Sequence, residues 1–174
     1  MDCDYDEMIE NERKNIDRAF NHVSSSAMKI CVCVRKRPLF SKETESGEID
    51  AVSCGNPKIF VHEPKIKVDG ITKYIQTHDF TFDNTYGNNE TSKHVYEYQI
   101  KNLIPTLFQK GVVTLFAYGQ TGSGKTFTIT DCTNDAVHQL FSTAPRGFTF
   151  FMSFFEIYGG KVSDLLNGKK KLAI

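Results

Sequence analysis

The stretch VVTLFAYGQTGSGKTF, residues 112–127, decides the fold that we predict for this chain. Its apolar first half is typical of a buried β-strand, and it leads into a glycine-rich octet that fits the phosphate-loop pattern G-x-x-x-x-G-K-[ST]. Gly122 and Gly124 lack a Cβ, so the backbone there can take positive φ and approach an anion closely. Successive backbone N–H groups would then form a concave anion site. Lys125 would bind the outer phosphates, and Thr126 would offer a hydroxyl to Mg²⁺.

The flanks of the octet distinguish a phosphate loop from a flexible Gly/Ser turn, which is the alternative. A strand must precede such a loop, and a helix must begin near its lysine and add a positive dipole end to the site. The apolar residues after the loop are those of a helix-like segment: Ile129, Ala136, Val137, Leu140 and Phe141. The order of strand, loop and helix therefore predicts an α/β fold.

The composition excludes several classes of protein. The chain has 174 residues, enough for one domain, and its 21 basic and 21 acidic residues give no global signal for binding nucleic acid. No apolar run approaches the ~20 residues of a membrane span, and the acidic N-terminus lacks the apolar core of a secretory signal. The five cysteines form no C-x-x-C pair, which argues against disulfides or zinc and predicts a reducing, cytoplasmic compartment.

Residues 1–27 are predicted to form an exposed amphipathic helix followed by a linker. Ile9, Ile16, Phe20 and Val23 are spaced by seven, four and three residues, so they would share one helical face. The serine run 24–26 would end the helix. A frayed tail is the alternative, because short isolated helices are marginal in water.

Residues 28–35 alternate between two apolar faces, which predicts a strand covered on both sides in an α/β sheet. The basic triplet 35–37 follows, and Pro38 would end the strand. The simplest interpretation of this triplet is a solvated strand end without a binding role. A role in contacting a phosphate or a base is the alternative, because a glycine-rich loop lies downstream.

Residues 48–68 contain short alternating pieces, which predict a small antiparallel subsheet with a lysine-rich turn. Asp69-Gly70 is itself a tight-turn signal. From the residues alone we prefer a plain surface hairpin. Residues 80–83 indicate one more short strand.

Thr91 or Ser92 would cap a helix in which apolar residues recur up to Leu107, and Pro105 would kink it or divide it in two. Residues 149–158 predict an aromatic strand, followed by a short turn or strand at 164–166. Glu156 could organise Mg²⁺, but the strand continues past it, so we prefer a structural role. The five histidines show no ligand spacing.

Three motifs in this order resemble the kinesin motor domain: VCVRKRPL (32–39), FAYGQTGSGKT (116–126) and FFEIYGGKVSDLLN (154–167). The chain is most similar to the internal-motor, microtubule-depolymerising (kinesin-thirteen) class, because VHEPKIKVD (61–69) resembles that class's long loop. The resemblance implies a three-layer α/β sandwich of the P-loop NTPase type. It covers residues 28–174 as a partial motor domain, and residues 1–27 resemble a neck only loosely.

The resemblance also implies a binding site for ATP and Mg²⁺, with Thr126 as the metal residue. Arg35, Pro38 and Phe127 would sandwich the adenine. The residues expected to hold the phosphates are Gly119, Gln120, Thr121, Gly122, Ser123, Gly124, Lys125 and Thr126.

Tubulin and microtubules are the implied partners, without nucleic acid or membrane, and the implied location is the cytoplasm and cytoskeleton, on spindle or ciliary microtubules. Lys67, Val68 and Asp69 would form the finger that presses on tubulin. The lysines at 169–171 would begin a second microtubule-facing loop.

The chain departs from the family pattern after the phosphate loop. The family's Asn-x-x-Ser-Ser-Arg and Asp-Leu-Ala-Gly-Ser-Glu segments do not occur, and no D-x-x-G is found anywhere in the sequence. These segments position the attacking water and the metal, so no catalytic residue is assigned and slow hydrolysis is expected. The strands that flank residues 112–118 in the family's sheet would also be missing, which would leave the central sheet incomplete.

Three interpretations follow. The chain is expected to be part of an ATP-binding microtubule depolymerase, either as a piece of a longer product, as half of a split motor or as a degenerate copy. A non-catalytic tubulin-interaction module is the second interpretation. A small phosphate-loop kinase with Glu156 as its metal acid is a distant third.

Overall fold

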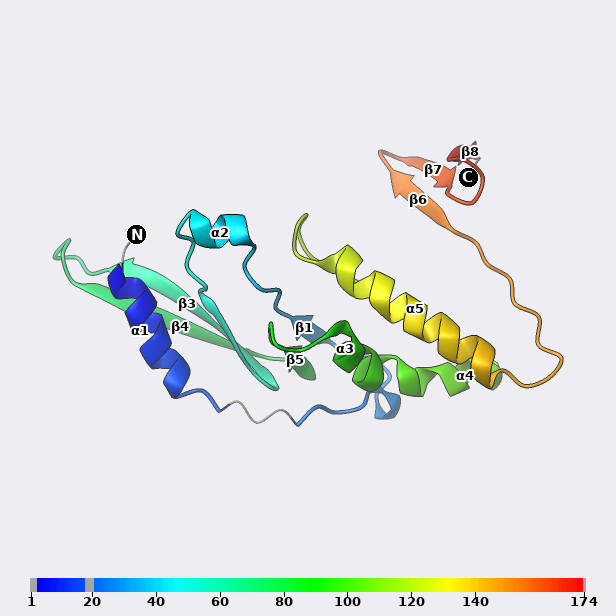
Figure 1. The fold of residues 1–174 in the computed structure, drawn as a ribbon, viewed down its shortest axis with the longest axis horizontal. Coiled ribbons are helices and arrows are strands. Elements are labelled where there is room, and N and C mark those ends of the chain that lie inside the picture. The colour runs from blue at the N-terminus through cyan, green and yellow to red at the C-terminus, as the bar shows by residue number, and fades with distance from the viewer. Residues whose placement is uncertain (1–2, 18–20, 174) are drawn as a thin grey trace. The chain divides into compact units, whose positions relative to one another are not determined.

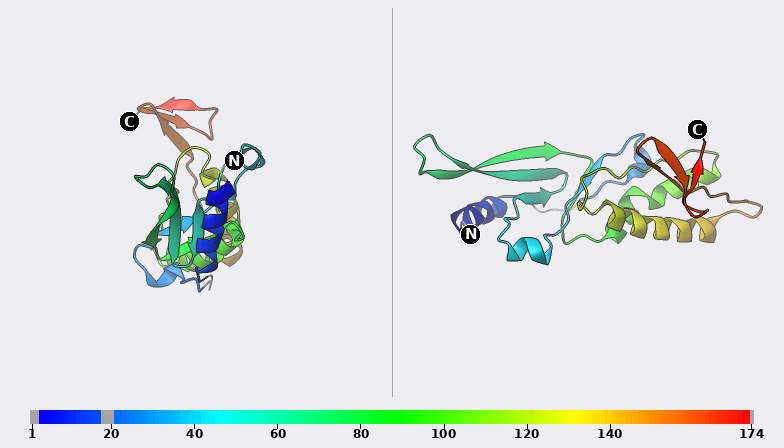
Figure 2. Two further views of the ribbon diagram at one scale, coloured as in Figure 1. Left: turned by 90° about the vertical axis from the view of Figure 1, so that its left-hand side faces the viewer. Right: turned by 90° about the horizontal axis from the view of Figure 1, so that it is seen from above.

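The computed structural model describes residues 3–17 and 21–173 and divides the chain into two compact units, Met1–Thr143 and Ala144–Ile174. Figures 1 and 2 show both units, which we describe separately. The first unit contains a three-stranded sheet, a two-stranded sheet and all the helices of the described residues. The second contains a small three-stranded sheet.

The N-terminal helix, α1 (Cys3–Lys14), is shorter than predicted and is not an exposed helix. It packs against β4 (Lys73–Thr81), and its Tyr5 and Ile9 side chains are buried, with Ile9 only 1% exposed. Ile16 and Val23 lie beyond the helix, and the predicted contribution of Phe20 lies outside the described residues. Burial against a sheet explains why this short helix is stable, because short helices gain most of their stability from tertiary packing.

The sheet beneath α1 confirms the predicted antiparallel subsheet. Its order is β2 (Val52–Gly55), β3 (Lys58–Ile66) and β4, and all pairs are antiparallel. The long β3–β4 hairpin is paired from Lys58↔Thr81 to Ile66↔Lys73. The separate strand predicted at 80–83 is wrong, because Phe80 and Thr81 are the last residues of β4.

The first unit also contains a pair of short parallel strands. Only β1 (Cys33–Arg35) of the strand predicted at 28–35 is formed, and it pairs with β5 (Asn84–Tyr86). The expectation that both faces would be covered is also wrong, since Ile30 is 80% exposed and Val32 is half-exposed. Both faces of a parallel sheet are buried only where other elements, usually helices, cover each of them, and the face of Ile30 and Val32 is left exposed here.

The helices of the first unit form its main apolar core. The predicted helix is divided by Pro105, as expected, into α3 (Ser92–Gln99), η2 (Lys101–Leu103) and α4 (Ile104–Phe108). The helix after the loop is α5 (Lys125–Thr143), which packs against α3. The buried residues of this core are Tyr86, Val95, Tyr96, Ile100, Ile104 and Cys132. The remaining helical elements are short: η1 (Ser25–Ala27) and α2 (Ser41–Glu45).

The strand predicted at 112–118 is not formed in the described structure. These residues belong to no sheet, and Phe116 is 86% exposed. Residues 112–118 have the apolar composition of a buried strand. A strand also needs a neighbouring backbone whose N–H and C=O groups can pair with its own. Among the described residues no segment does so, in agreement with the expectation that the flanking strands are missing.

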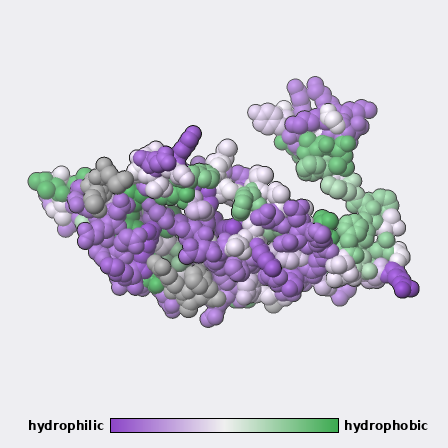
Figure 3. All heavy atoms as spheres, in the orientation of Figure 1, coloured by the Kyte–Doolittle hydropathy of each residue, from purple (hydrophilic) through white to green (hydrophobic). Residues whose placement is uncertain are grey.

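The second unit is an antiparallel sheet of β6 (Phe155–Tyr158), β7 (Lys161–Asp164) and β8 (Lys170–Leu172). Only the end of the aromatic strand predicted at 149–158 is formed. Gly159 and Gly160 both take positive φ in the two-residue turn between β6 and β7, which is the turn that such hairpins favour. Figure 3 shows apolar surface on this unit, where Phe151 and Ile157 are exposed.

Replacing Ile9 by alanine should destabilise the first unit by about 2–4 kcal/mol, because the change removes a fully buried side chain between α1 and the sheet. Denaturant unfolding followed by circular dichroism measures this loss. Met8→Ala is the matched control on the same helix, where the side chain is only partly buried, and we expect a smaller effect there. Equal stabilities of Ile9→Ala and the wild type would contradict the packing of α1.

Candidate functional site

The glycine-rich loop connects residues 112–118 to the start of α5 and has the conformation that its glycines permit. Gly122 and Gly124 have φ of 83° and 91°, values that other residues rarely adopt. A Cβ on Gly119 would lie 2.5 Å from the Ser123 Oγ and 3.3 Å from the Ser123 Cβ, so a side chain at this position would force Ser123 to move. The loop is also closed by a hydrogen bond from Ser123 N to Gln120 O (3.2 Å).

Lys125 lies at the junction of the loop and α5. Its Nζ donates to the carbonyl oxygens of Gly119 (2.6 Å) and Gln120 (2.7 Å), so the ammonium lies over the loop. Because α5 begins at Lys125, its positive dipole end lies in the same place. The cation and the helix terminus together favour an anion at the loop.

Arg35 is held in a fixed position by three hydrogen bonds. Its Nη1 donates to Ser92 Oγ and Thr128 Oγ1, both at 2.8 Å, and its Nη2 donates to Glu90 O at 3.1 Å. Its guanidinium carbon lies 5.6 Å from the centre of the Phe127 ring. The end of β1 is therefore tied to α3, α5 and the loop before α3.

A pocket of about 560 Å³ lies beside this arginine. It brings together Arg35, Pro38 and Phe127, the three residues expected to enclose a base. The other residues that line it are Asn88, Asn89, Glu90, Thr91, Ser92, Lys93, Asp131, Asn134 and Asp135. The phosphate loop enters α5 immediately before Phe127, so the chain connects the anion site directly to the pocket.

Several of these lining residues were not predicted from the sequence. Asp131 and Asp135 follow Phe127 at spacings of four and eight, so all three lie on one face of α5. That spacing could have identified them. Glu90 and its neighbours gave no such signal, because they lie in a loop that has no periodicity.

The residues proposed for tubulin lie in the turn between β3 and β4. The Asp69 carboxylate accepts hydrogen bonds from Ile71 N (2.9 Å), Thr72 N (2.8 Å) and Thr72 Oγ1 (2.5 Å). These bonds lower the pKa of Asp69, with that from the Thr72 hydroxyl as the largest cause. Val68 is fully exposed at the tip. Asp69 thus shapes the turn, while Val68 is presented to solvent.

Two further expectations concern metals and membranes. Glu156 lies on β6 and pairs with Lys169 at 3.2 Å, an arrangement that fits the structural role we preferred. Within residues 3–17 and 21–173, no three His, Cys, Asp or Glu side chains are grouped so as to hold a metal ion. No helix in those ranges is long and apolar enough to cross a membrane.

Comparisons with known proteins agree on one family. A sequence profile of the kinesin motor domain matches residues 35–174. Kinesin-like protein KIN-13B of Arabidopsis thaliana is 42% identical over 155 residues, which cover 86% of this chain and 22% of that protein. The chain therefore spans less than a quarter of the length of this relative.

Two solved structures have a similar fold. A KIF14 dimer with AMP-PNP in complex with a microtubule gives a TM-score of 0.63 at 28% identity, covering 84% of this chain and 45% of that one. KIF14 with ADP in complex with a microtubule gives 0.61 at 27% identity, covering 79% and 41%. The mixed α/β structure with its partial sheets is consistent with an incomplete motor domain of this fold.

The Asp69 hydrogen bonds should control the order of the hairpin turn. In the Asp69→Ala variant we expect faster amide exchange at Ile71 and Thr72, measured by NMR, because their N–H groups lose their acceptor. Since the folded-state pKa of Asp69 is lowered, its stabilising effect is present above the ordinary value of 3.8 and is lost as the pH falls below that value. Asp79→Ala, a carboxylate on β4 outside the turn, is the control. Unchanged exchange in Asp69→Ala would contradict this role.

Proposed function

This chain belongs to the kinesin motor-domain family, and from that premise we propose that it is the ATP-binding part of a microtubule motor. The observation that carries the proposal is the pocket beside Arg35, whose lining residue Phe127 directly follows in the chain a phosphate loop with positive-φ glycines and a lysine at a helix start. No residue of the loop itself lines the pocket. A base would fit between Arg35, Pro38 and Phe127, since a guanidinium and an aromatic ring can both stack on its face.

The loop geometry supports binding of the nucleotide phosphates. The ammonium of Lys125 already lies over the loop, where it donates to two neutral carbonyl oxygens. A phosphate is a stronger partner for this cation than a carbonyl, because it carries a full negative charge and adds Coulomb attraction to the hydrogen bonds. Thr126 follows in the first turn of α5, and its hydroxyl is the group that would hold Mg²⁺, which would neutralise phosphate charge.

We expect slow hydrolysis by this chain. Phosphoryl transfer depends on groups that position the attacking water and neutralise charge opposite the phosphate loop. The two segments that supply those groups in the kinesin family do not occur in these 174 residues. We therefore propose nucleotide binding as the activity of this chain and assign no catalytic residue.

The exposed hairpin supports tubulin as the partner. Lys67 offers a charge and Val68 an apolar contact at the end of a nine-residue strand pair. The 42% identity to KIN-13B supports placement in the kinesin-thirteen class, and hence microtubule depolymerisation as the activity of the whole protein. Cytoplasmic microtubules, in the spindle or cilium, are the location that goes with this class.

A non-catalytic tubulin-interaction module is the second candidate function. The observation that favours it is that the hairpin is completed by its own sheet and by α1, without any contribution from the phosphate loop. Tubulin binding that does not depend on nucleotide would support this alternative. Nucleotide-dependent binding would support the motor.

Replacing Lys125 by alanine should weaken binding of a fluorescent ATP analogue to the purified chain by about tenfold or more, because it removes the cation that pairs with the phosphates. Fluorescence titration in the presence of Mg²⁺ measures the dissociation constant. Lys42→Ala, an exposed lysine on α2, is the matched control and should leave the affinity unchanged. If Lys125→Ala binds as tightly as the wild type, the phosphate-loop assignment is wrong.

The Lys67→Ala and Val68→Ala variants should reduce co-sedimentation with tubulin polymers several-fold, because both side chains are removed from the tip without loss of the Asp69 hydrogen bonds. Lys58→Ala serves as the control, since it removes a lysine from the opposite end of the same strand. Equal binding by all three variants and the wild type would exclude the tip as the contact.

A further inference from the structure

The N-terminal linker, residues 21–26, follows a defined path along β5 and α3. The Asn84 side chain is fully buried and pairs with the linker backbone: its Oδ1 accepts from Val23 N (2.9 Å) and its Nδ2 donates to Val23 O (2.7 Å). Asn56 Nδ2 donates to Asn21 O (2.7 Å), and Ser25 Oγ donates to Gln99 O (2.7 Å). These hydrogen bonds hold the linker in place, and residues 21–23 are not part of the helix that the sequence predicted there.

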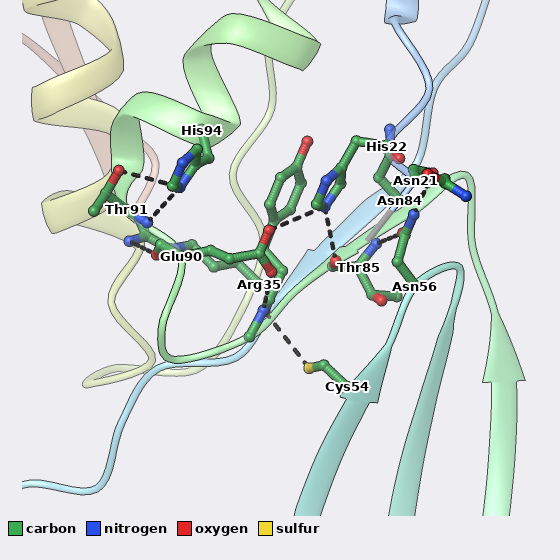
Figure 4. A network of polar contacts seen from close by, with 12 residues as sticks. Asn21, His22, Arg35, Cys54, Asn56, Asn84, Thr85, Glu90, Thr91 and His94 are labelled. Carbon is green, nitrogen blue, oxygen red and sulfur yellow. Dashed lines mark hydrogen bonds and ion pairs between the residues drawn. The ribbon is translucent and has the colours of Figure 1, made fainter. Parts of the chain in front are cut away.

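His22 is the residue of this linker that reaches inward. Its ring stacks on Tyr86, with centroids 4.5 Å apart and planes at 9°, and a second ring, Tyr98, lies 5.0 Å away. Its side chain is only 4% exposed. Figure 4 shows the ring pointing toward Thr85 and Glu90.

The Nε2 atom of His22 lies 3.2 Å from Thr85 O and 3.2 Å from Glu90 Oε1. Both of these oxygens are acceptors, so Nε2 must carry a proton and donate it. The stacking positions the ring so that its Nε2 faces both the Thr85 carbonyl, with which it forms a hydrogen bond, and the Glu90 carboxylate beside it.

Glu90 connects His22 to the pocket. Its other carboxylate oxygen, Oε2, accepts from Gly87 N at 2.7 Å and closes the loop before α3. Its backbone carbonyl accepts from Arg35 Nη2 at 3.1 Å, and the residue itself lines the pocket. A rotation of the Glu90 side chain would break its hydrogen bond to Gly87 N and loosen the loop 87–90, whose Glu90 carbonyl is one of the three acceptors that orient Arg35.

We propose that His22 is a positioning residue for the nucleotide pocket: by holding Glu90, it fixes the loop 87–90 and the orientation of Arg35, and it thereby couples the N-terminal linker to nucleotide affinity. The inference rests on the proposed nucleotide-binding function. Because coupling is reciprocal, a nucleotide that binds the ordered pocket must also stabilise the docked linker.

Two substitutions separate the hydrogen bond of His22 from its stacking. His22→Phe keeps an aromatic ring on Tyr86 but has no donor for Glu90. His22→Gln keeps a donor but loses the stack. We expect His22→Phe to bind a fluorescent ADP analogue about five- to tenfold more weakly and His22→Gln to bind within about twofold of the wild type. A role in packing alone would give the opposite order.

His78→Phe is the matched control. His78 also lies near a glutamate, with its Nε2 3.0 Å from Glu63 Oε2, but this pair is exposed on β3 and β4 and does not line the pocket. The same change there should leave nucleotide affinity unchanged. The double variant His22→Phe, Glu90→Gln should be little worse than the weaker of its two single variants, because both changes remove one connection.

Hydrogen exchange provides a second readout, which is independent of the affinity measurements. In the wild-type chain, saturating ADP should slow amide exchange at Val23, whose N–H binds Asn84, and this protection should be smaller in His22→Phe. If the wild type binds no nucleotide, the proposed function and this inference both fail. If the wild type binds nucleotide but His22→Phe binds equally well, or if ADP leaves Val23 exchange unchanged, only the role of His22 is overturned.

Discussion

The hydrogen bonds of Arg35 are the interaction on which the candidate site depends. β1 is only three residues long and pairs with a single strand, so it cannot be held in place by a sheet alone. The guanidinium fixes it to Ser92, Thr128 and the Glu90 carbonyl, which belong to α3, α5 and the loop before α3. Arginine suits this role because its planar fork directs several donors at once. The pocket exists because these elements meet at one side chain.

A second polar network supports the hairpin that carries the residues proposed to contact tubulin. Arg13 of α1 donates to Ser53 Oγ at 2.9 Å, Ser53 pairs with His62 Nε2 at 2.9 Å, and His62 Nδ1 pairs with Thr77 Oγ1 at 3.0 Å. His62 is buried, and burial, aided by the charge of Arg13, lowers its pKa. A neutral imidazole is the form that such an environment favours. The chain of contacts crosses β2, β3 and β4, so α1 and the sheet form one structure.

The N-terminal segment thus contacts both candidate binding regions. Its helix packs on the hairpin sheet, and its linker reaches the pocket through His22 and Glu90. Two other stretches carry several exposed apolar residues each: 112–118 and the residues before and within β6. These stretches have the composition of sheet interiors, yet the described structure gives them little pairing. A buried strand needs apolar side chains and also a neighbouring backbone with which to pair. The side-chain sequence of a segment indicates the first requirement but not the second.

The sequence by itself determined the features that depend on local chemistry. Glycines at 122 and 124 permit the loop, Pro105 divides the helix, and the Asp69-Gly70 pair makes the hairpin turn, because each acts on the backbone within a few residues. Only the tertiary structure decided how long β1 and β6 are, that α1 is packed rather than exposed, and that His22 meets Glu90 across 68 residues of chain. Each of these features depends on contacts between segments that lie far apart in the sequence. The hydrophobic periodicity of a segment indicates its local structure but does not indicate which distant segment it will contact.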